Sequence, residues 1–237
     1  TQIAETGEVQ RARLGVVGQN LTSDLASAFD LDITQGAVVA QVMETMDIRP
    51  GDQILDLGCG NGWATRILAQ KAPGAQAIGV DASAEMIAKA EELHSFTIRA
   101  RYERSTFEEL DFPDGKFQRV FSMEALYYSS EPAKVIAEMH RLLKEGGTAD
   151  IVIDCYEERT ATHHWGDSLG LSLQVLSESA WAQLFTDAGF SEVKTSRVID
   201  TRGPGDEADF TPSDTYPDFA ARATFFEQGS LWIHAER

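Results

Sequence analysis

A glycine-rich turn flanked by two acidic residues is the part of the sequence best suited to chemistry. Asp56 lies inside the short apolar run 53–57, alternating glycines follow it, and Asp81 ends the next apolar run. The glycines are Gly58, Gly60 and Gly62. A carboxylate at position 56 would repel a diphosphate but suits a cationic group, and an acid at position 81 suits two ribose hydroxyls. The spacing therefore predicts a site for a nucleoside with a positively charged tail.

Two other nucleotide-binding turns fit the sequence less well. The dinucleotide fingerprint needs G-x-G-x-x-G or A, and Trp63 occupies its last position here. An indole at that point conflicts with the close helix–strand packing that a third glycine permits. No GKS or GKT follows the turn, which excludes a P-loop. An NAD-dependent oxidoreductase is therefore the least favoured hypothesis for the function.

The segments that must position these residues alternate between strand-like and helix-like patterns. Strands are expected at 53–57, 75–80, 97–103, 117–122 and 148–156, and helices at 35–46, 62–71, 83–93 and 131–144. Ser130 is placed to cap the last of these helices, and the glycine pair at 146–147 to end it. This alternation predicts a parallel sheet with helices on both faces and a ligand at the carboxyl ends of its strands.

The last third of the chain departs from this rhythm. A helix at 178–188 and a strand at 191–200 precede a final strand expected within 223–237. Two successive strands without an intervening helix pair in antiparallel fashion. The sheet should therefore end in an antiparallel strand.

Four blocks of the sequence resemble one enzyme family. "ILDLGCGNGWATRIL" and "IGVDASAEMIAKA" look like the first two motifs of class I S-adenosylmethionine-dependent methyltransferases, and "ERSTFEELDFPDGKFQRVFSMEALYY" and "EMHRLLKEGGTADIVIDCY" match the later blocks in order and spacing. The resemblance covers about residues 35–155 and is nearest to the ubiquinone/menaquinone-biosynthesis-like group. It implies an α/β, Rossmann-like doubly wound fold with a mostly parallel seven-stranded sheet and an antiparallel last strand. Residues 1–34 are then an expected capping segment, and 35–237 the methyltransferase domain.

The resemblance assigns donor-binding roles by position. The donor would be S-adenosylmethionine and its product S-adenosylhomocysteine. Asp56 would bind the amino group of the donor and Asp81 its ribose, while Met123 would lie near the sulfonium. The adenine would contact Ala82 and Met86, and the methionine portion would contact Gly58, Cys59, Gly60 and Asn61. Thr106 and Phe107 stand where many relatives have Asp-Ala. The threonine weakens the contact to the adenine amino group, and Glu108 is the candidate replacement. No metal ion is expected.

Candidate residues for the acceptor side follow the strands at 117–122 and 148–156. Glu124 and Tyr128 in "SMEALYYSS" and His163 in "CYEERTATHHWGDS" are the candidate catalytic residues. Tyrosine rings can face a methylammonium or sulfonium, and a histidine can act as a base near neutral pH, although adjacent histidines in a polar loop also suit a solvated role. Residues 156–176 and 201–219 are expected as elaborations around the acceptor, the second as a lid or a surface insertion.

Composition narrows the partners and the function. The formal net charge of −18 argues against nucleic acid and anionic membrane surfaces, and no apolar stretch approaches the length of a membrane span. The two cysteines lack the spacing of a disulfide framework or zinc site, and no secretory pattern opens the sequence, so a cytoplasmic location is expected. The sequence predicts an enzyme that methylates a small molecule at O, N or C. A non-catalytic donor-binding sensor or scaffold is the alternative, and the acceptor and oligomeric state stay open.

The acidity supports two hypotheses that a melting experiment separates. With six lysines against fourteen arginines and acids spread along the chain, the sequence suits a salt-adapted host as well as a merely acidic protein. Salt screens repulsion between surface carboxylates, so salt adaptation predicts that the Tm rises between low and molar KCl. Circular dichroism measures the Tm. A Tm that stays level or falls would contradict salt adaptation and support the hypothesis of a merely acidic protein.

Overall fold

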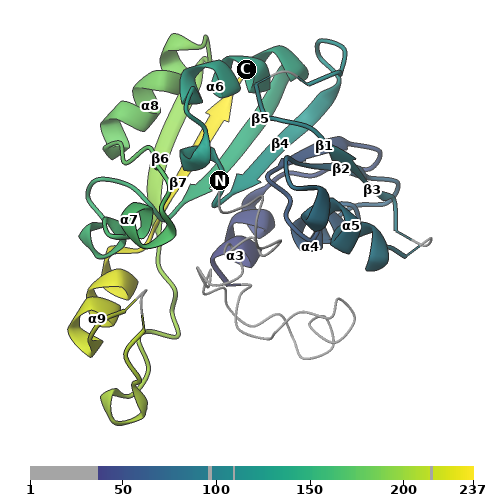
Figure 1. Cartoon of the computed structure of the whole chain (residues 1–237). Coiled ribbons are helices and arrows are strands. Elements are labelled where there is room, and N and C mark those ends of the chain that lie inside the picture. The colour runs from purple at the N-terminus through teal and green to yellow at the C-terminus, as the bar shows by residue number, and fades with distance from the viewer. Residues whose placement is uncertain (1–36, 96–97, 109, 214–215) are drawn as a thin grey trace.

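The computed structural model describes residues 37–95, 98–108, 110–213 and 216–237 of the chain. The capping segment expected at 1–34 lies outside these residues, so it stays a prediction. Within the described part of the chain, helices pack on both faces of one central sheet (Figure 1).

The sheet has seven strands in the order β3-β2-β1-β4-β5-β7-β6. They are β1 Gln53–Leu57, β2 Gln76–Asp81, β3 Ala100–Arg104, β4 Phe117–Met123, β5 Leu143–Ile153, β6 Glu192–Val198 and β7 Ser230–Glu236. The first five pair in parallel, and β7 lies antiparallel to both β5 and β6. The strand order reverses between β1 and β4, which is where open α/β sheets bind their ligands. The fold class predicted from the sequence is confirmed.

Two layers of helices cover the sheet, and a further group of segments lies beyond one edge. Helices α3 (Ala37–Thr45), α4 (Trp63–Leu68) and α5 (Ala84–Glu92) pack on one face, and α6 (Pro132–Leu142) and α8 (Glu178–Asp187) on the other. The short helix α7 (Trp165–Leu169) and helix α9 (Phe219–Gln228) lie together at the end of the sheet, away from α6 (Figure 1). Short 3-10 turns are η2 (Leu126–Tyr128), η3 (Thr160–Thr162) and η4 (Glu207–Asp209).

Helix α6 shows why the sequence pattern predicted this layer correctly. Its apolar positions recur at helical spacing, and Val135, Ile136, Met139 and Leu142 are all fully buried. Burial of each such side chain stabilises the fold by about 1.5–3 kcal/mol. Periodicity thus predicts the face of the helix, because the sheet beneath α6 offers a continuous apolar surface.

Both predicted ends of this helix were wrong. Glu131 occupies the N-cap position and Pro132 the first turn, while Ser130 makes no cap. The helix ends at Leu142, and β5 begins at Leu143 and runs through the glycine pair at 146–147. Proline suits the first helical turn because it needs no backbone N–H there, so it sets the start one residue later than the serine suggested.

The expected final strand at 223–237 was half wrong. Its first part belongs to helix α9, whose N-cap Asp218 accepts a hydrogen bond from the backbone N–H of Ala221 at 2.7 Å. Gly229, with φ 69°, ends the helix, and β7 starts at Ser230. A helix therefore does intervene between β6 and β7, and the two strands still pair in antiparallel fashion. None of the described helices combines the length and apolarity needed to cross a membrane.

A buried carboxylate on β5 ties β7 to the sheet by side chains as well as by backbone. Asp150 is 1% exposed and pairs in register with His234. Its Oδ1 atom lies 3.0 Å from the donating Nε1 of Trp232 and 2.8 Å from Nδ1 of His234. The hydrogen bond to Asp150 raises the pKa of His234 above its ordinary value, against partial burial, while Lys194 and Glu192 on β6 act with opposite signs.

The contribution of His234 to stability should shrink as the pH rises from about 6 to about 9. A pKa raised in the folded state means that the stabilisation is present in full below the unfolded pKa of about 6.5 and is lost as the pH rises through the folded value. His234→Gln keeps a donor without titrating, and should cost no more than about 1 kcal/mol at the acid end, because the imidazole is partly open to water. Urea unfolding at both pH values measures the change.

His140→Gln provides a control with the opposite sign. Burial and the charge of Arg237 lower the pKa of His140, so its unfolded state binds protons more readily than its folded state. The wild-type protein should therefore gain stability relative to this variant as the pH rises. Equal slopes for the two variants would contradict the Asp150–His234 assignment.

Candidate active site

The turn after β1 is built for close contact with the segment after β4. Gly58 has φ 78°, and a Cβ added to it would lie 2.2 Å from Cβ of Ala125. The Cβ added to Gly58 would also lie 3.3 Å from the ring of Phe107, which is buried. Only glycine satisfies both the left-handed backbone and this approach. The glycine turn, the residues after β3 and the residues after β4 are therefore held together at the switch point of the sheet.

A second close approach explains how a turn without a third spaced glycine still packs tightly. A Cβ added to Gly79 in β2 would lie 2.6 Å from Oγ1 of Thr65 in α4 and 2.8 Å from Sγ of Cys59. The glycine that admits the helix thus lies on the neighbouring strand, and Trp63 stays partly buried at the start of α4. The glycine spacing in the turn did not reveal this residue, because it lies in β2.

Asp81 holds the turn from the end of β2. It is fully buried, its Oδ2 accepts from the backbone N–H of Gly60 at 3.0 Å, and its Oδ1 accepts from that of Ser83 at 2.9 Å. Ser83 in turn caps α5 by accepting from the backbone N–H of Met86 at 3.3 Å. A Cβ added to Gly60 would meet nothing within 4 Å, so there is free space beside the turn residue whose N–H binds Asp81.

Asp56 is a buried acid with an unusual titration. It is 1% exposed and accepts a hydrogen bond from the hydroxyl of Thr65 at 2.6 Å. Burial raises the pKa of Asp56 to about 7, the Thr65 hydrogen bond acts against the rise, and the charge of Asp81 adds to it. A cation placed beside Asp56 would favour its ionised form. Asp56 therefore fits the ammonium-bearing ligand that the spacing predicted.

The remaining donor-side residues fall around this turn in different surroundings. Cys59 is 4% exposed, and burial raises the pKa of its thiol well above the ordinary value, which makes it a poor nucleophile. Asn61 accepts from a guanidinium N–H of Arg66 through its backbone carbonyl at 2.9 Å. Met86 is partly buried, and Ala82 and Thr106 are exposed. Glu108, the candidate replacement for the missing adenine contact, accepts instead from the hydroxyl of Ser129 at 2.9 Å.

Glu124 is the most constrained of the candidate residues at the carboxyl ends of β4 and β5. It follows Met123, the last residue of β4, and its φ of 51° is the sole positive φ among the described non-glycine residues. Its two carboxyl oxygens accept from the hydroxyl of Tyr127 at 2.8 Å and from the backbone N–H of Asp154 at 2.6 Å. A left-handed glutamate costs about 1–3 kcal/mol and is typical of functional sites. Burial, followed by the charge of Asp154, raises the pKa of Glu124 well above its ordinary value.

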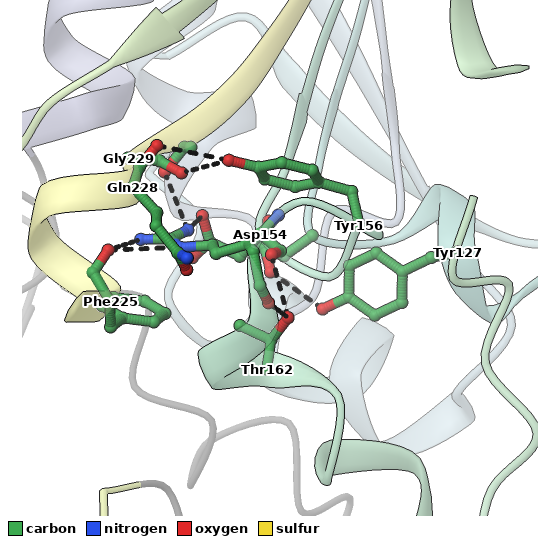
Figure 2. A network of polar contacts seen from close by, with 10 residues as sticks. Tyr127, Asp154, Tyr156, Thr162, Phe225, Gln228 and Gly229 are labelled. Carbon is green, nitrogen blue, oxygen red and sulfur yellow. Dashed lines mark hydrogen bonds and ion pairs between the residues drawn. The ribbon is translucent and has the colours of Figure 1, made fainter. Parts of the chain in front are cut away.

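A buried ion pair lies directly behind this glutamate. Asp154 and Arg159, 3% and 2% exposed, pair through a short contact, and the hydroxyl of Thr162 donates to the backbone carbonyl of Asp154 at 3.3 Å. The Arg159 guanidinium also donates to the carbonyl of Phe225 at 2.8 Å and lies 3.5 Å above the centre of its ring. Figure 2 shows Asp154 and Thr162 from the loop after β5 on one side of this network and Phe225 from α9 on the other, and Arg159 links them. The network therefore joins two segments that are far apart in the sequence.

Tyr156 fastens the same loop to the start of β7. Its hydroxyl donates to the carbonyl oxygens of Gln228 at 3.3 Å and Gly229 at 2.9 Å (Figure 2). Tyr127 is 1% exposed and reaches the network from the opposite side through Glu124. The structure therefore brings together the ends of β4 and β5 and the C-terminal part of α9.

The other two candidate catalytic residues predicted from the sequence, Tyr128 and His163, differ from Glu124 in their burial and contacts. Tyr128 is partly buried and its ring packs against that of Tyr127, with 4.6 Å between ring centres. His163 is exposed, and its Nε2 lies 2.8 Å from the backbone carbonyl of Glu157 in its own loop. None of the contacts described for His163 reaches Glu124 or Asp154, so the geometry favours the solvated role that the sequence left as an alternative.

Sequence reasoning named Tyr127 beside Glu124 but missed the other residues that support this glutamate. Asp154 stands immediately after β5, as Asp81 stands at the end of β2, so position alone was a usable signal. Arg159, Thr162 and Phe225 carried no such signal, because their roles depend on how the loop after β5 folds against α9. The fold therefore contributes most of this network.

Comparisons with known proteins agree with this geometry. Residues 54–147 match the model of the family described as "Methyltransferase domain". An uncharacterized methyltransferase from Synechocystis is 34% identical over 62% of this chain and 67% of its own length. The trans-aconitate 2-methyltransferase of Deinococcus radiodurans is 30% identical over 67% and 66%, and a sterol 24-C-methyltransferase of Yarrowia lipolytica is 32% identical over 50% and 32%. The chain thus spans about a third of the sterol enzyme and about two thirds of the other two.

Solved structures share the architecture. A chain of the Haloferax volcanii complex between the Trm112 methyltransferase activator and a protein named as a methyltransferase has a TM-score of 0.77 and 27% identity, over 84% of this chain and 88% of that one. Geranyl diphosphate C-methyltransferase of Streptomyces coelicolor A3(2), with a TM-score of 0.67 and 16% identity over 84% and 78%, shares the fold. The fold, the glycine turn and its two acids define a nucleoside-dependent group transferase. The chain belongs to the class I S-adenosylmethionine-dependent methyltransferases. Its placement in the ubiquinone/menaquinone-like group stays a prediction.

Loss of the Asp81 carboxylate should weaken donor binding. Asp81→Ala removes charge-assisted hydrogen bonds and should cost roughly 1.5–3 kcal/mol in the affinity for S-adenosylmethionine and S-adenosylhomocysteine alike. Titration calorimetry measures both, with circular dichroism to verify folding. Asp111→Asn, which changes an exposed acid, is the matched control. Unchanged donor affinity in a folded Asp81→Ala protein would refute the ribose assignment.

Proposed function

We propose that the protein transfers the methyl group of S-adenosylmethionine to a small molecule bound at the ends of β4 and β5. The observation that carries this proposal is the constrained carboxylate of Glu124, which stands between the glycine turn and the Asp154–Arg159 network. The named relatives act on small molecules as different as a sterol and trans-aconitate, so the family alone leaves the acceptor open.

The donor-side residues suit the parts of S-adenosylmethionine. The molecule supplies a methyl group already activated on a sulfonium, so the protein has chiefly to align acceptor and donor, which is worth several kcal/mol. Asp56 would hold the ammonium group, Asp81 the ribose hydroxyls, and the backbone of 58–61 the methionine portion. Phe107, Met86 and Met123 would line the adenine and sulfonium ends, as the resemblance implies.

Glu124 would act on the acceptor as a general base. Its raised pKa means that the carboxylate holds a proton more tightly than an ordinary glutamate does, which suits a group that must accept one. The Tyr127 hydroxyl and the Asp154 backbone N–H fix both of its oxygens, so its orientation does not depend on the acceptor. Tyr128, stacked on Tyr127, is proposed as a wall of the acceptor site rather than as an acid or base.

The two expected elaborations would form the rest of the acceptor site. Trp165 from α7 and Tyr216 both pack against Phe225, with ring centres 6.0 Å and 5.2 Å away. The Tyr216 hydroxyl and the Trp165 Nε1 are buried and lack hydrogen-bond partners among the described residues. Buried polar groups of this kind are usually satisfied by water or a ligand. Residues 156–176 and 201–219 are therefore proposed as the aromatic cover of the acceptor, the second as a lid.

Methyl transfer is tested by incubating the protein with methyl-labelled S-adenosylmethionine and fractionated metabolite extracts. A labelled small molecule is expected, and Glu124→Gln should lower the rate of its formation by about 100-fold or more, as loss of a general base does. S-adenosylhomocysteine affinity should not change in this variant, because the thioether carries no charge. Because the Haloferax neighbour was solved with an activator, the assay runs with and without Trm112.

The control variant for this assay is Glu145→Gln, which alters an exposed acid near the opposite end of β5 and should keep full activity. Donor binding without a labelled product in any fraction would contradict the enzyme and favour the sensor or scaffold. Full activity of Glu124→Gln would contradict the base.

A further inference from the structure

At the carboxyl ends of β4 and β5, where the acceptor is proposed to bind and which we call the acceptor edge, the described residues carry one excess negative charge whenever Glu124 is ionised. Glu124 and Asp154 are acids, and Arg159 is the one cation whose charge acts on Glu124, while it is already paired with Asp154. The other titratable groups that face Glu124 are Tyr127 from η2 and Cys155 after β5, and the pKa of each is raised, so both are uncharged at neutral pH. Tyr216 lies beyond them near Asp154, and its pKa is raised as well.

This excess charge lies next to the donor turn. Glu124 immediately precedes Ala125, whose Cβ fills the space that a side chain at Gly58 would need. One residue before Met123, the hydroxyl of Ser122 donates to the backbone carbonyl of Leu57 at 2.8 Å. The end of β4 is therefore tied to the donor turn on both sides of the residue that carries the carboxylate.

A positive sulfonium at this turn would balance the ionised carboxylate. In the transfer, the acceptor atom forms a bond to the methyl carbon, and the carbon–sulfur bond breaks with its electron pair left on sulfur. If the proton of the acceptor moves to Glu124, the sulfur becomes an uncharged thioether and the carboxylate an uncharged acid. The buried edge then carries no net charge before or after the step, which avoids the cost of an isolated buried charge.

We infer that the methyl acceptor is an uncharged molecule with a removable O–H, N–H or activated C–H proton, and that Glu124 takes up this proton as the sulfonium charge disappears. This inference rests on the proposed function. A phosphate or tricarboxylate would add negative charge beside Glu124 and Asp154, where Arg159 is already engaged by Asp154 and by the carbonyl of Phe225. We therefore expect polyanions of the trans-aconitate or geranyl diphosphate type to be poor acceptors.

The inference predicts a proton released on donor binding. In the donor-free protein, burial and Asp154 favour the protonated form of Glu124. A nearby sulfonium favours the ionised form, whereas the uncharged thioether of S-adenosylhomocysteine does not. Binding of S-adenosylmethionine should therefore release up to about one proton more than binding of S-adenosylhomocysteine. As the pH rises toward the pKa of Glu124 in the donor-free protein, the affinity for S-adenosylmethionine should increase relative to that for S-adenosylhomocysteine, by up to about tenfold per pH unit.

Calorimetry in buffers of different ionisation enthalpy counts these protons. Wild-type protein and Glu145→Gln should show the difference between the two ligands, and Glu124→Gln should lose it while still binding S-adenosylhomocysteine. Equal proton counts for the two ligands in the wild-type protein would overturn the inference. Because this readout needs no acceptor, it stands apart from the activity assay that tests the proposed function.

The acceptor class is tested on the labelled product. Cation exchange first removes the unreacted donor and any cationic product, and anion exchange of the flow-through should then leave the label in the unretained, neutral fraction. Purified trans-aconitate and geranyl diphosphate should accept no label. Label in the strongly retained fraction, or on either probe, would overturn the inference while confirming methyl transfer itself.

Discussion

The close approach of the β1 and β4 ends is the constraint on which the rest of the site depends. Gly58 has no side chain, so Ala125 can lie against the glycine turn, and the preceding residue, Glu124, is held between that turn and Asp154. The left-handed backbone of Glu124 is the cost of this placement, because the chain must turn sharply to bring Ala125 inward while keeping the carboxylate at the edge. The Tyr127 and Asp154 hydrogen bonds keep the residue in that conformation.

The Asp154–Arg159 pair is a second feature of the site that carries a cost in folding free energy. Moving both charges out of water costs several kcal/mol, and a buried ion pair seldom recovers it in full. Here the pair is supported by the carbonyl and the ring of Phe225, so the guanidinium is satisfied on several sides. Its effect is to join the loop after β5 to α9 in one arrangement, which places the Asp154 backbone N–H under Glu124. Specific placement of that N–H is a better account of the pair than net stability.

The parts of the structure that were predictable from the sequence are those set by local pattern. Periodicity gave the buried face of α6, and strand and helix alternation gave the parallel sheet, because both follow from burial of an apolar face. Element ends depended on neighbouring residues that compete for the same position. Pro132, rather than Ser130, sets the start of α6, and the helix capped by Asp218 runs into the range expected for the last strand. The support of Glu124 depended on contacts between segments about seventy residues apart, such as Arg159 and Phe225, and no local pattern encodes these.

The position of β7 has a consequence for how the protein is made. β7 follows β6 in the chain but lies between β5 and β6 in the sheet. On a ribosome, β6 therefore has no partner strand until β7 has emerged, whereas β1 to β5 can already pair with one another. The strands that flank the glycine turn can assemble while synthesis continues, but the network around Asp154, which needs α9 and Gly229, must wait until the end of synthesis. A nascent chain would thus be able to form the glycine turn and its two acids before it can complete the wall of the proposed acceptor site.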